Sequence, residues 1–226
     1  MSRRRGIVIA IDGVVGSGKS TTARLVAEEL GYRHLDTGAM YRAVTLAAMR
    51  RGAAPEDTEA LASLLASIDI ALEPHAQSGR VLLDGEDVSD AIRRPEVTRR
   101  VGSYADLPVV RRALVAQQQR MGAQGGVVAE GRDTASVVFP DADLKIRMVA
   151  ALEERARRRQ RELSAKGVSI SLEEVAETVR QRDQQDAVRD YGATAARGDV
   201  VEVDTTAMTL EEQVRAVADL ARRRGA

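Results

Sequence analysis

The 226-residue sequence predicts an α/β fold, in which helices flank a parallel sheet. Two further parts are inserted into this fold, namely a small antiparallel sheet and a pair of charged helices. Three observations favour this fold. Apolar runs with strand character alternate with segments of helical periodicity, as in parallel-sheet proteins. Between residues 68 and 88 the apolar pattern changes to period two and meets an Asp-Gly turn signal. Residues 152–166 and 171–189 are rich in Arg and Glu and are separated at Gly167, which indicates two helices.

The first half of the parallel sheet begins with a buried strand. Residues 7–11 form a continuous apolar run that stops at Asp12, as expected of a strand covered on both faces. A helix is predicted over residues 20–30 and a short strand over 32–36. Two more helices follow over 39–51 and 55–66. Gly31 and Gly52 stand where helices commonly end in a left-handed residue.

The remaining elements follow the same logic. Residues 81–83 lead into Asp84-Gly85, which predicts a tight hairpin turn. A helix is predicted over 108–121, core strands over 126–130, 144–149 and 200–203, and a last helix over 209–223. Thr209 and Glu212 have the spacing of a capping box at the start of that helix.

Composition and charge exclude several classes of function. Hydrophobic residues make up 44% of the chain and aromatic residues 2%, so the core must be aliphatic. The 34 basic and 34 acidic residues balance, which leaves no overall field to hold nucleic acid or an anionic membrane. The absence of cysteine excludes disulfides and thiol chemistry. Because the apolar run behind the basic N-terminus is too short to span a membrane, we expect a cytoplasmic protein without membrane contact.

A phosphate-binding loop is predicted between the first strand and the first helix. Residues 13–20 match the pattern G-x-x-x-x-G-K-[ST] in the required strand–loop–helix context. Glycines let backbone N–H groups approach phosphates, and the helix N-terminus favours negative charge. Lys19 would reach the β- and γ-phosphates of ATP, and Ser20 would ligate Mg²⁺. The residues predicted to contact ATP in this loop are Gly13, Val14, Val15, Gly16, Ser17, Gly18, Lys19, Ser20 and Thr21.

Other features decide which P-loop chemistry applies. The chain contains no Asn and no D-x-x-G segment, which excludes a GTPase switch. The run that ends at Glu130 could supply the metal-binding acid of a motor or transporter ATPase, but Gly131-Arg132-Asp133 follows at once. This places a cation at the carboxyl end of a parallel strand, where ligands bind in open α/β sheets. A second phosphate is expected at Arg132.

A second polar cluster follows the strand predicted at 32–36. Asp36 or Thr37 could simply cap the next helix. Alternatively, the Thr37 hydroxyl, the Tyr41 phenol and the Arg42 guanidinium belong to a ligand site at the same edge of the sheet as the phosphate loop. Two anion sites on one edge describe an enzyme that joins two phosphates.

These segments carry a resemblance to a known family. The segments that carry it occur in family order over nearly the whole chain. They are Ile11-Asp12-Gly13 with the phosphate loop, residues 36–42, residues 85–89 with Ile92-Arg93, residues 130–133, residues 137–142, the group Arg182-Asp183, Asp186 and Arg189, and residues 203–206. In these segments the sequence resembles the bacterial-type cytidylate kinases, which are P-loop nucleoside-monophosphate kinases.

The resemblance implies a domain plan and a set of site residues. It implies an ATP-binding core over 1–67, 104–151 and 190–226, an NMP-binding insert over 68–103, and a lid over 152–189. Lid arginines similar to those of the family are Arg155 and Arg159, with a catalytic role beside Lys19 and Arg132, and Arg158, which would contact ATP. The three arginines share one helical face by their spacing. The implied CMP-binding residues are Thr37, Tyr41, Arg42, Arg111, Arg132, Asp133, Arg182, Asp186 and Arg189.

The sequence departs from the family pattern at four places. Val14 replaces a usual Pro in the phosphate loop, and Gly102 replaces a Ser that usually contacts the base. Residues 134–136 replace an apolar-Gly-Thr segment, and residues 190–192 replace one that usually contains Pro-Leu. The last three border the implied CMP site, so they affect the expected base selectivity and level of activity.

The resemblance implies transfer of the γ-phosphoryl group of ATP to CMP or dCMP by direct in-line attack, with Mg²⁺, by a monomer that binds no nucleic acid. Two alternatives stay open. One is a related kinase for another small acceptor, namely AMP, UMP or shikimate. The other is a degenerate P-loop protein that binds nucleotide as a regulatory module.

Overall fold

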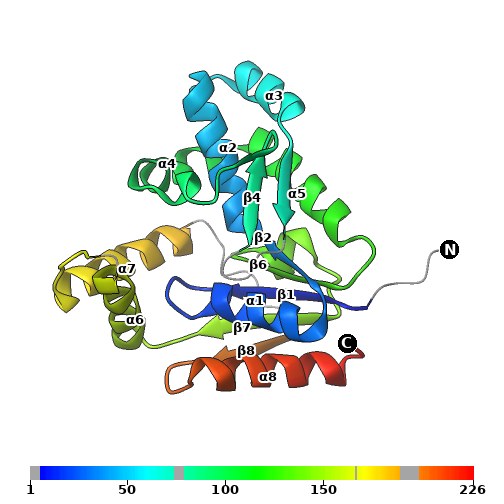
Figure 1. The fold of residues 1–226 in the computed structure, drawn as a ribbon, viewed down its shortest axis with the longest axis vertical. Helices are drawn as coiled ribbons and strands as arrows, with labels where there is room; N and C mark the ends of the chain where they lie inside the picture. The colour runs from blue at the N-terminus through cyan, green and yellow to red at the C-terminus, as the bar shows by residue number, and fades with distance from the viewer. Residues whose placement is uncertain (1–5, 74–78, 166, 189–198) are drawn as a thin grey trace. The chain divides into compact units, whose positions relative to one another are not determined.

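The computed structural model describes residues 6–73, 79–165, 167–188 and 199–226. The chain divides into two compact units. The first comprises Met1–Tyr32 and Gln124–Ala226, and the second comprises Arg33–Ala123. Figure 1 shows the ribbon coloured from blue at the N-terminus to red at the C-terminus, with most helices and strands labelled.

A parallel sheet forms the centre of the first unit. Strands β6 (Val127–Gly131), β1 (Val8–Gly13), β7 (Leu144–Val149) and β8 (Val200–Asp204) follow one another in that order. β1 pairs with β6 and β7, and β7 pairs with β8, all in parallel register. The central strand β1 therefore hydrogen-bonds on both edges, and residues 8–11 are buried, as the continuous apolar run predicted.

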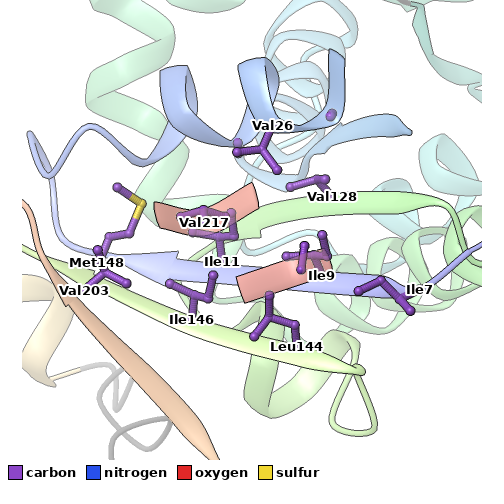
Figure 2. Packing of buried hydrophobic residues seen from close by; sticks show 13 residues of the cluster. Ile7, Ile9, Ile11, Val26, Val128, Leu144, Ile146, Met148, Val203 and Val217 are labelled. Carbon is purple, nitrogen blue, oxygen red and sulfur yellow. The ribbon is translucent and has the colours of Figure 1, made fainter. Parts of the chain in front are cut away.

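An aliphatic core joins this sheet to two helices, α1 (Lys19–Leu30) and α8 (Leu210–Arg223). Figure 2 shows Ile9, Ile11 and Ile146 of the sheet packed with Val26 of α1 and Val217 of α8. These five side chains are completely buried, and each such side chain contributes about 1.5–3 kcal/mol on leaving water.

The predicted ends of the two core helices are confirmed. Gly31 follows α1 in the left-handed conformation with φ of 66°. The Thr209 hydroxyl caps α8 by accepting the backbone N–H of Glu212, and the Glu212 carboxylate accepts the backbone N–H of Thr209. These two bonds complete the predicted capping box. Both helix ends therefore have partners for backbone groups that helices leave unpaired.

Two charged helices form a hairpin within the first unit. α6 (Leu152–Ala165) and α7 (Leu172–Val188) enclose a small core of Ala156, Val175 and Val179. Gly167 lies between them with φ of 77°, a conformation that favours glycine. The predicted pair of helices is confirmed.

The second unit contains β2 (Arg33–Asp36), α2 (Thr37–Arg51), α3 (Thr58–Ser67) and α5 (Pro108–Gly122). Its antiparallel sheet consists of β3 (Ile70–Glu73), β4 (Arg80–Leu83) and β5 (Glu86–Asp87). Asp84 and Gly85 connect β4 to β5 with φ values of 52° and 82°, so both lie in the left-handed region that a two-residue hairpin turn requires. The predicted hairpin is confirmed.

The structure also contains elements that were not predicted. A 3₁₀ turn covers Ala91–Arg93, and α4 covers Pro95–Ala105 with the proline in its first turn. A π-helical turn covers Thr134–Val138, with two residues between it and the end of β6. Among the described residues, none of the helices has the length and apolar character needed to cross a bilayer.

Candidate phosphate-binding site

The phosphate loop links β1 to α1 and depends on three glycines. A Cβ on Gly13 would lie 2.5 Å from the carbonyl oxygen of Met148, and a Cβ on Gly16 would lie 3.2 Å from the carbonyl oxygen of Arg155. Gly16 and Gly18 have φ values of 77° and 88°, which other residues rarely adopt. The loop is thus a backbone cradle at a helix N-terminus, the arrangement that binds phosphate.

Three carbonyl oxygens of the phosphate loop accept hydrogen bonds from side chains of the protein. The Ser17 hydroxyl donates to the carbonyl of Val14 at 2.9 Å, and the Thr205 hydroxyl donates to the carbonyl of Ser17 at 2.8 Å. Arg155 donates to the carbonyl of Val15 at 3.3 Å. These bonds hold the loop in one conformation before a ligand arrives, which favours binding.

A buried carboxylate lies beside Lys19. The Lys19 ammonium is 2.6 Å from an oxygen of Glu130, and the Ser20 hydroxyl donates to the same oxygen at 2.9 Å. Glu130 is at the end of β6, and its side chain is 3% exposed. The hydroxyl and carboxylate oxygens are the ligand type that Mg²⁺ prefers, so the donor set fits a magnesium ion. Within the described residues, no cluster of three or more acidic or His side chains forms a metal site by itself.

Asp12 connects β1 to the π-helical turn after β6. Its carboxylate accepts the backbone N–H groups of Thr134 and Ala135 at 2.8 and 2.9 Å. Burial raises the pKa of Asp12, and the two N–H groups oppose that change. The turn follows Arg132 and Asp133, so Asp12 holds the segment that carries two of the implied CMP-binding residues.

The Asp12→Ala variant should be less stable than the wild type by about 2–4 kcal/mol, because it leaves two buried N–H groups without acceptors. The free energy of unfolding in urea measures this loss. Asp141→Ala removes an exposed carboxylate a few residues beyond the same turn, and it should cost less than about 0.5 kcal/mol. Equal losses in the two variants would contradict the anchoring role of Asp12.

The end of β6 is connected to α7 through Asp186. Asp186 is buried and forms ion pairs with Arg132 and, at 3.8 Å, with Arg182. The structure thus brings together three of the implied CMP-binding residues, and Asp133 is buried next to Arg132 in the chain. Arg189 lies outside the described residues.

The three arginines that the resemblance assigns to a lid have different surroundings. Arg155 is buried against the phosphate loop and pairs with Asp183 of α7. Arg158 donates to Glu154 and to the hydroxyl of Thr205. Arg159 is exposed and pairs with Glu162 of the same helix at 2.8 Å. Two of the arginines therefore contact residues around the phosphate loop, and the third lies on the helix surface.

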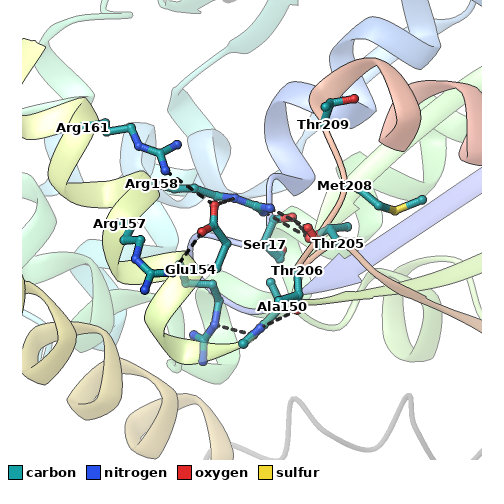
Figure 3. A network of polar contacts seen from close by, with 12 residues as sticks. Ser17, Ala150, Glu154, Arg157, Arg158, Arg161, Thr205, Thr206, Met208 and Thr209 are labelled. Atoms are coloured by element: carbon teal, nitrogen blue, oxygen red, sulfur yellow. Dashed lines mark hydrogen bonds and ion pairs between the residues drawn. The ribbon is translucent and has the colours of Figure 1, made fainter.

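Figure 3 shows the polar network around Arg158. Thr205 is completely buried, and its hydroxyl also contacts the carbonyl of Val149 at 3.1 Å. Thr206 accepts the backbone N–H of Ala151 at 2.9 Å. The loop between β8 and α8 thus connects Arg158, the start of α6 and the phosphate loop.

In the second unit, Asp36 caps α2 by accepting the backbone N–H of Ala39 at 2.8 Å, so of the two residues considered as a cap it is Asp36 that takes this position. Thr37 is buried in the first turn of α2. Arg42 donates to the hydroxyl of Thr98 in α4 at 2.8 Å. Tyr41 lies between these residues on α2, and Arg111 lies in the first turn of α5.

Three of the four departures from the family pattern lie within the described residues. Gly102 lies in α4 beside the exposed Ser103, and residues 134–136 belong to the π-helical turn. Val14 supplies the carbonyl that accepts the Ser17 hydroxyl bond, a role that any residue type can fill. Residues 190–192 lie outside the described residues.

Sequence reasoning missed several residues of this site. Asp12, Asp183, Thr205 and Gln213 were not predicted to act there, and Glu130 was considered only for an ATPase. Gln213 accepts a bond from Thr22 of α1, and its side chain occupies the space that a Cβ on Gly18 would need. A buried polar residue that contacts the loop from a distant part of the sequence has no local pattern, so no periodicity would have found it.

The family model described as cytidylate kinase matches residues 9–223. A protein named cytidylate kinase from Geobacter sulfurreducens is 45% identical over 221 residues, which cover 98% of this chain and 95% of that protein. A cytidylate kinase from Pelodictyon phaeoclathratiforme is 46% identical over 228 residues, covering 98% and 97%. A solved structure of an uncharacterized protein from Eubacterium ventriosum covers 97% of this chain and 99% of that chain with a TM-score of 0.52 and 11% identity, a likeness of fold alone.

Proposed function

We propose that this chain, which belongs to the cytidylate kinase family, transfers the γ-phosphoryl group of ATP to CMP and dCMP. The observation that carries the proposal is the combination of a family match over residues 9–223 with a phosphate loop whose lysine lies beside a buried acid. The match extends far beyond the phosphate loop, which many unrelated proteins share. A kinase for AMP, UMP or shikimate and a purely regulatory nucleotide-binding module are therefore not favoured.

The donor site in this proposal is the phosphate loop. Backbone N–H groups of residues 13–21 hold the ATP phosphates, and Lys19 neutralises charge on the β- and γ-phosphates. Ser20 would hold Mg²⁺ with help from Glu130, and the ion, when bound, neutralises phosphate charge and orients the γ-phosphoryl group. The shared contact of Ser20 and Lys19 with Glu130 supports this assignment.

The acceptor site in this proposal uses two groups of residues. From the first unit, Arg132 binds the CMP phosphate, and Asp133 reads the base; Arg182, Asp186 and Arg189 complete the nucleotide contacts. The ion pairs of Asp186 with Arg132 and Arg182 support this grouping. From the second unit, the proposed residues are Thr37, Tyr41, Arg42 and Arg111.

No covalent intermediate is needed. The CMP phosphate oxygen attacks the γ-phosphorus in line, and Lys19 and the arginines stabilise the charge that the transferring group carries. Among the lid arginines, Arg158 contacts ATP and Arg159 moves to the phosphates. The ion-pair partner of Arg159, Glu162, is exposed, so this ion pair is weak and costs little to break. Closure of the lid excludes water, which would otherwise accept the phosphoryl group.

We further propose the domain plan given above, with a core, an insert over residues 68–103 and a lid over 152–189. The α6–α7 hairpin and the β3–β4–β5 sheet support the lid and the insert. The protein is proposed to act as a cytoplasmic monomer on small nucleotides and not on nucleic acid. Its balanced charge of 34 basic and 34 acidic residues supports the last point.

Steady-state kinetics with ATP and each nucleoside monophosphate test this function. Cytosine presents an amino donor where uracil presents a carbonyl, so a carboxylate at Asp133 accepts from cytosine and faces an unmatched oxygen in uracil. An unpaired polar group costs about 1–3 kcal/mol, and kcat/KM should favour CMP over UMP by at least roughly tenfold. The Asp133→Ala variant should lose more activity on CMP than on UMP.

The control in this test is dCMP, which carries the same base and should show the same preference over UMP. Gly102 removes a usual base contact, so the preference for CMP over UMP in kcat/KM is expected to lie near the lower bound of roughly tenfold. Equal kcat/KM for CMP and UMP in the wild type would contradict the cytidylate assignment. Tight binding of ATP without turnover of any nucleotide would instead indicate a regulatory module.

A further inference from the structure

Arg155 is the most enclosed of the lid arginines. Its side chain is 8% exposed and donates through Nε to the carbonyl of Ala150 at 2.9 Å and through Nη1 to the carbonyl of Val15 at 3.3 Å. Nη1 and Nη2 also donate to the two oxygens of Asp183 at 2.9 and 2.7 Å. Four of the five N–H groups of a guanidinium are therefore used.

This arrangement leaves Arg155 little capacity for a phosphate. A bidentate pair with a carboxylate is among the strongest polar contacts in proteins, and this one is largely shielded from water. Transfer of Arg155 to a ligand would break the pair and leave the carbonyl of Val15 without this donor. Such a cost is hard to reconcile with a role as a mobile phosphate contact.

A second contact joins the same residue to the loop through the backbone. A Cβ on Gly16 would lie 3.0 Å from the Cβ of Arg155 and 3.2 Å from its carbonyl oxygen. The first turns of α6 thus pack directly on the phosphate loop at a position where only glycine leaves room. This contact does not depend on the guanidinium.

Asp183 brings the second lid helix into the same arrangement. It lies on α7, whose Val175 and Val179 pack on Ala156 of α6, next to Arg155 in the chain. The Arg155–Asp183 pair therefore connects the lid hairpin to the phosphate loop by side chains from both of its helices.

We propose that Arg155 is a positioning residue, not a catalytic one, and that Asp183 is the partner through which it fixes the lid on the phosphate loop. This inference rests on the proposed function. It predicts that loss of Asp183 has the same consequence as loss of Arg155, since either change releases the lid from the loop. If Arg155 instead contacted the transferring phosphate, loss of Asp183 would free the guanidinium and preserve the rate.

The test compares Asp183→Asn, Arg155→Lys and the double variant with the wild type, with kcat, KM for each substrate and the rate of ATP hydrolysis without CMP as readouts. We expect each single variant to lower kcat by at least about tenfold and to raise the ratio of hydrolysis to transfer, because a loosely held lid admits water. The double variant should lose little more than either single one, as expected for residues that act as a unit. Urea unfolding of each variant confirms that the measured protein is folded.

Matched controls are Arg161→Ala on α6 and Glu177→Gln on α7, which change side chains that are 70% and 53% exposed and should leave kcat within about twofold. A folded Asp183→Asn variant with wild-type kcat beside a slow Arg155→Lys variant would overturn the proposal and make Arg155 catalytic. Losses that add in the double variant would also overturn it. Failure of the proposed function is a separate result, because the wild type itself would then not phosphorylate CMP.

Discussion

The Lys19→Ala variant should transfer phosphate from ATP to CMP at least about 10³-fold more slowly than the wild type, because a preorganised donor to the transferring group is worth about that much. Lys19 follows the glycines of the phosphate loop and is the first residue of α1. Measurement of kcat by ADP release gives the effect directly. Near-normal turnover would mean that the loop is structural.

The pairing of Lys19 with Glu130 complicates this experiment in a way that the sequence did not reveal. The phosphate-loop pattern assigns Lys19 to phosphate and not to the core, which suggests that the fold survives its loss. In the structure Glu130 is buried, and Lys19→Ala removes a charge partner of this carboxylate, which typically costs about 3–5 kcal/mol. The Lys19→Ala/Glu130→Gln double variant should regain most of that stability and none of the activity. Recovery of activity in the double variant would show that the single variant had failed by unfolding.

The sheet and most helices could be predicted because their signals are local. The run over residues 7–11, the Asp84-Gly85 turn and the Thr209–Glu212 capping box each lie within a few residues of the structure that they produce. α4 was missed although Val97, Val101 and Tyr104 are buried at helical spacing. The other residues of α4 are mostly polar and include a glycine and two adjacent arginines. The apolar stripe is therefore too short to stand out as a helical pattern.

The partners of the candidate site residues could not be predicted in the same way. Asp12 and Thr134 are 122 residues apart in the chain, and Thr205 and Ser17 are 188 residues apart. The spacing of Arg155, Arg158 and Arg159 suggested one common face, and the structure places Arg159 on the exposed surface with Glu162. Sequence spacing fixes the direction of a side chain around its helix axis only roughly, and tertiary contacts decide which member is buried.

The candidate phosphate-binding cations of the first unit share one property. Lys19 pairs with Glu130, and Arg132 pairs with Asp186. A partly buried cation without a counter-ion is costly, so each carboxylate stabilises the protein before phosphate arrives. In the proposed function, a phosphate takes over cations that already have partners, so a chain with equal numbers of acidic and basic residues would still present local anion sites.

Arg132→Ala should raise the KM for CMP by roughly 10–150-fold and leave the KM for ATP nearly unchanged, since a charged hydrogen bond to phosphate is worth about 1.5–3 kcal/mol. Arg132 directly follows β6, at the carboxyl end of a parallel strand, where ligands bind in such sheets. Arg42→Ala in α2 should produce the same pattern. Initial rates with one substrate varied and the other saturating give both constants.

The matched control is Arg180→Ala, which removes an exposed arginine of α7 that pairs with Glu177, and it should change neither constant by more than about twofold. Arg132→Ala also removes an ion pair of Asp186, so Arg132→Lys serves as a second variant that keeps a positive charge at the position. It should recover part of the affinity for CMP but not the paired geometry that a guanidinium offers to phosphate. If the KM for ATP rose while that for CMP stayed constant, Arg132 would belong to the donor site, and the two phosphate sites would have been assigned in reverse.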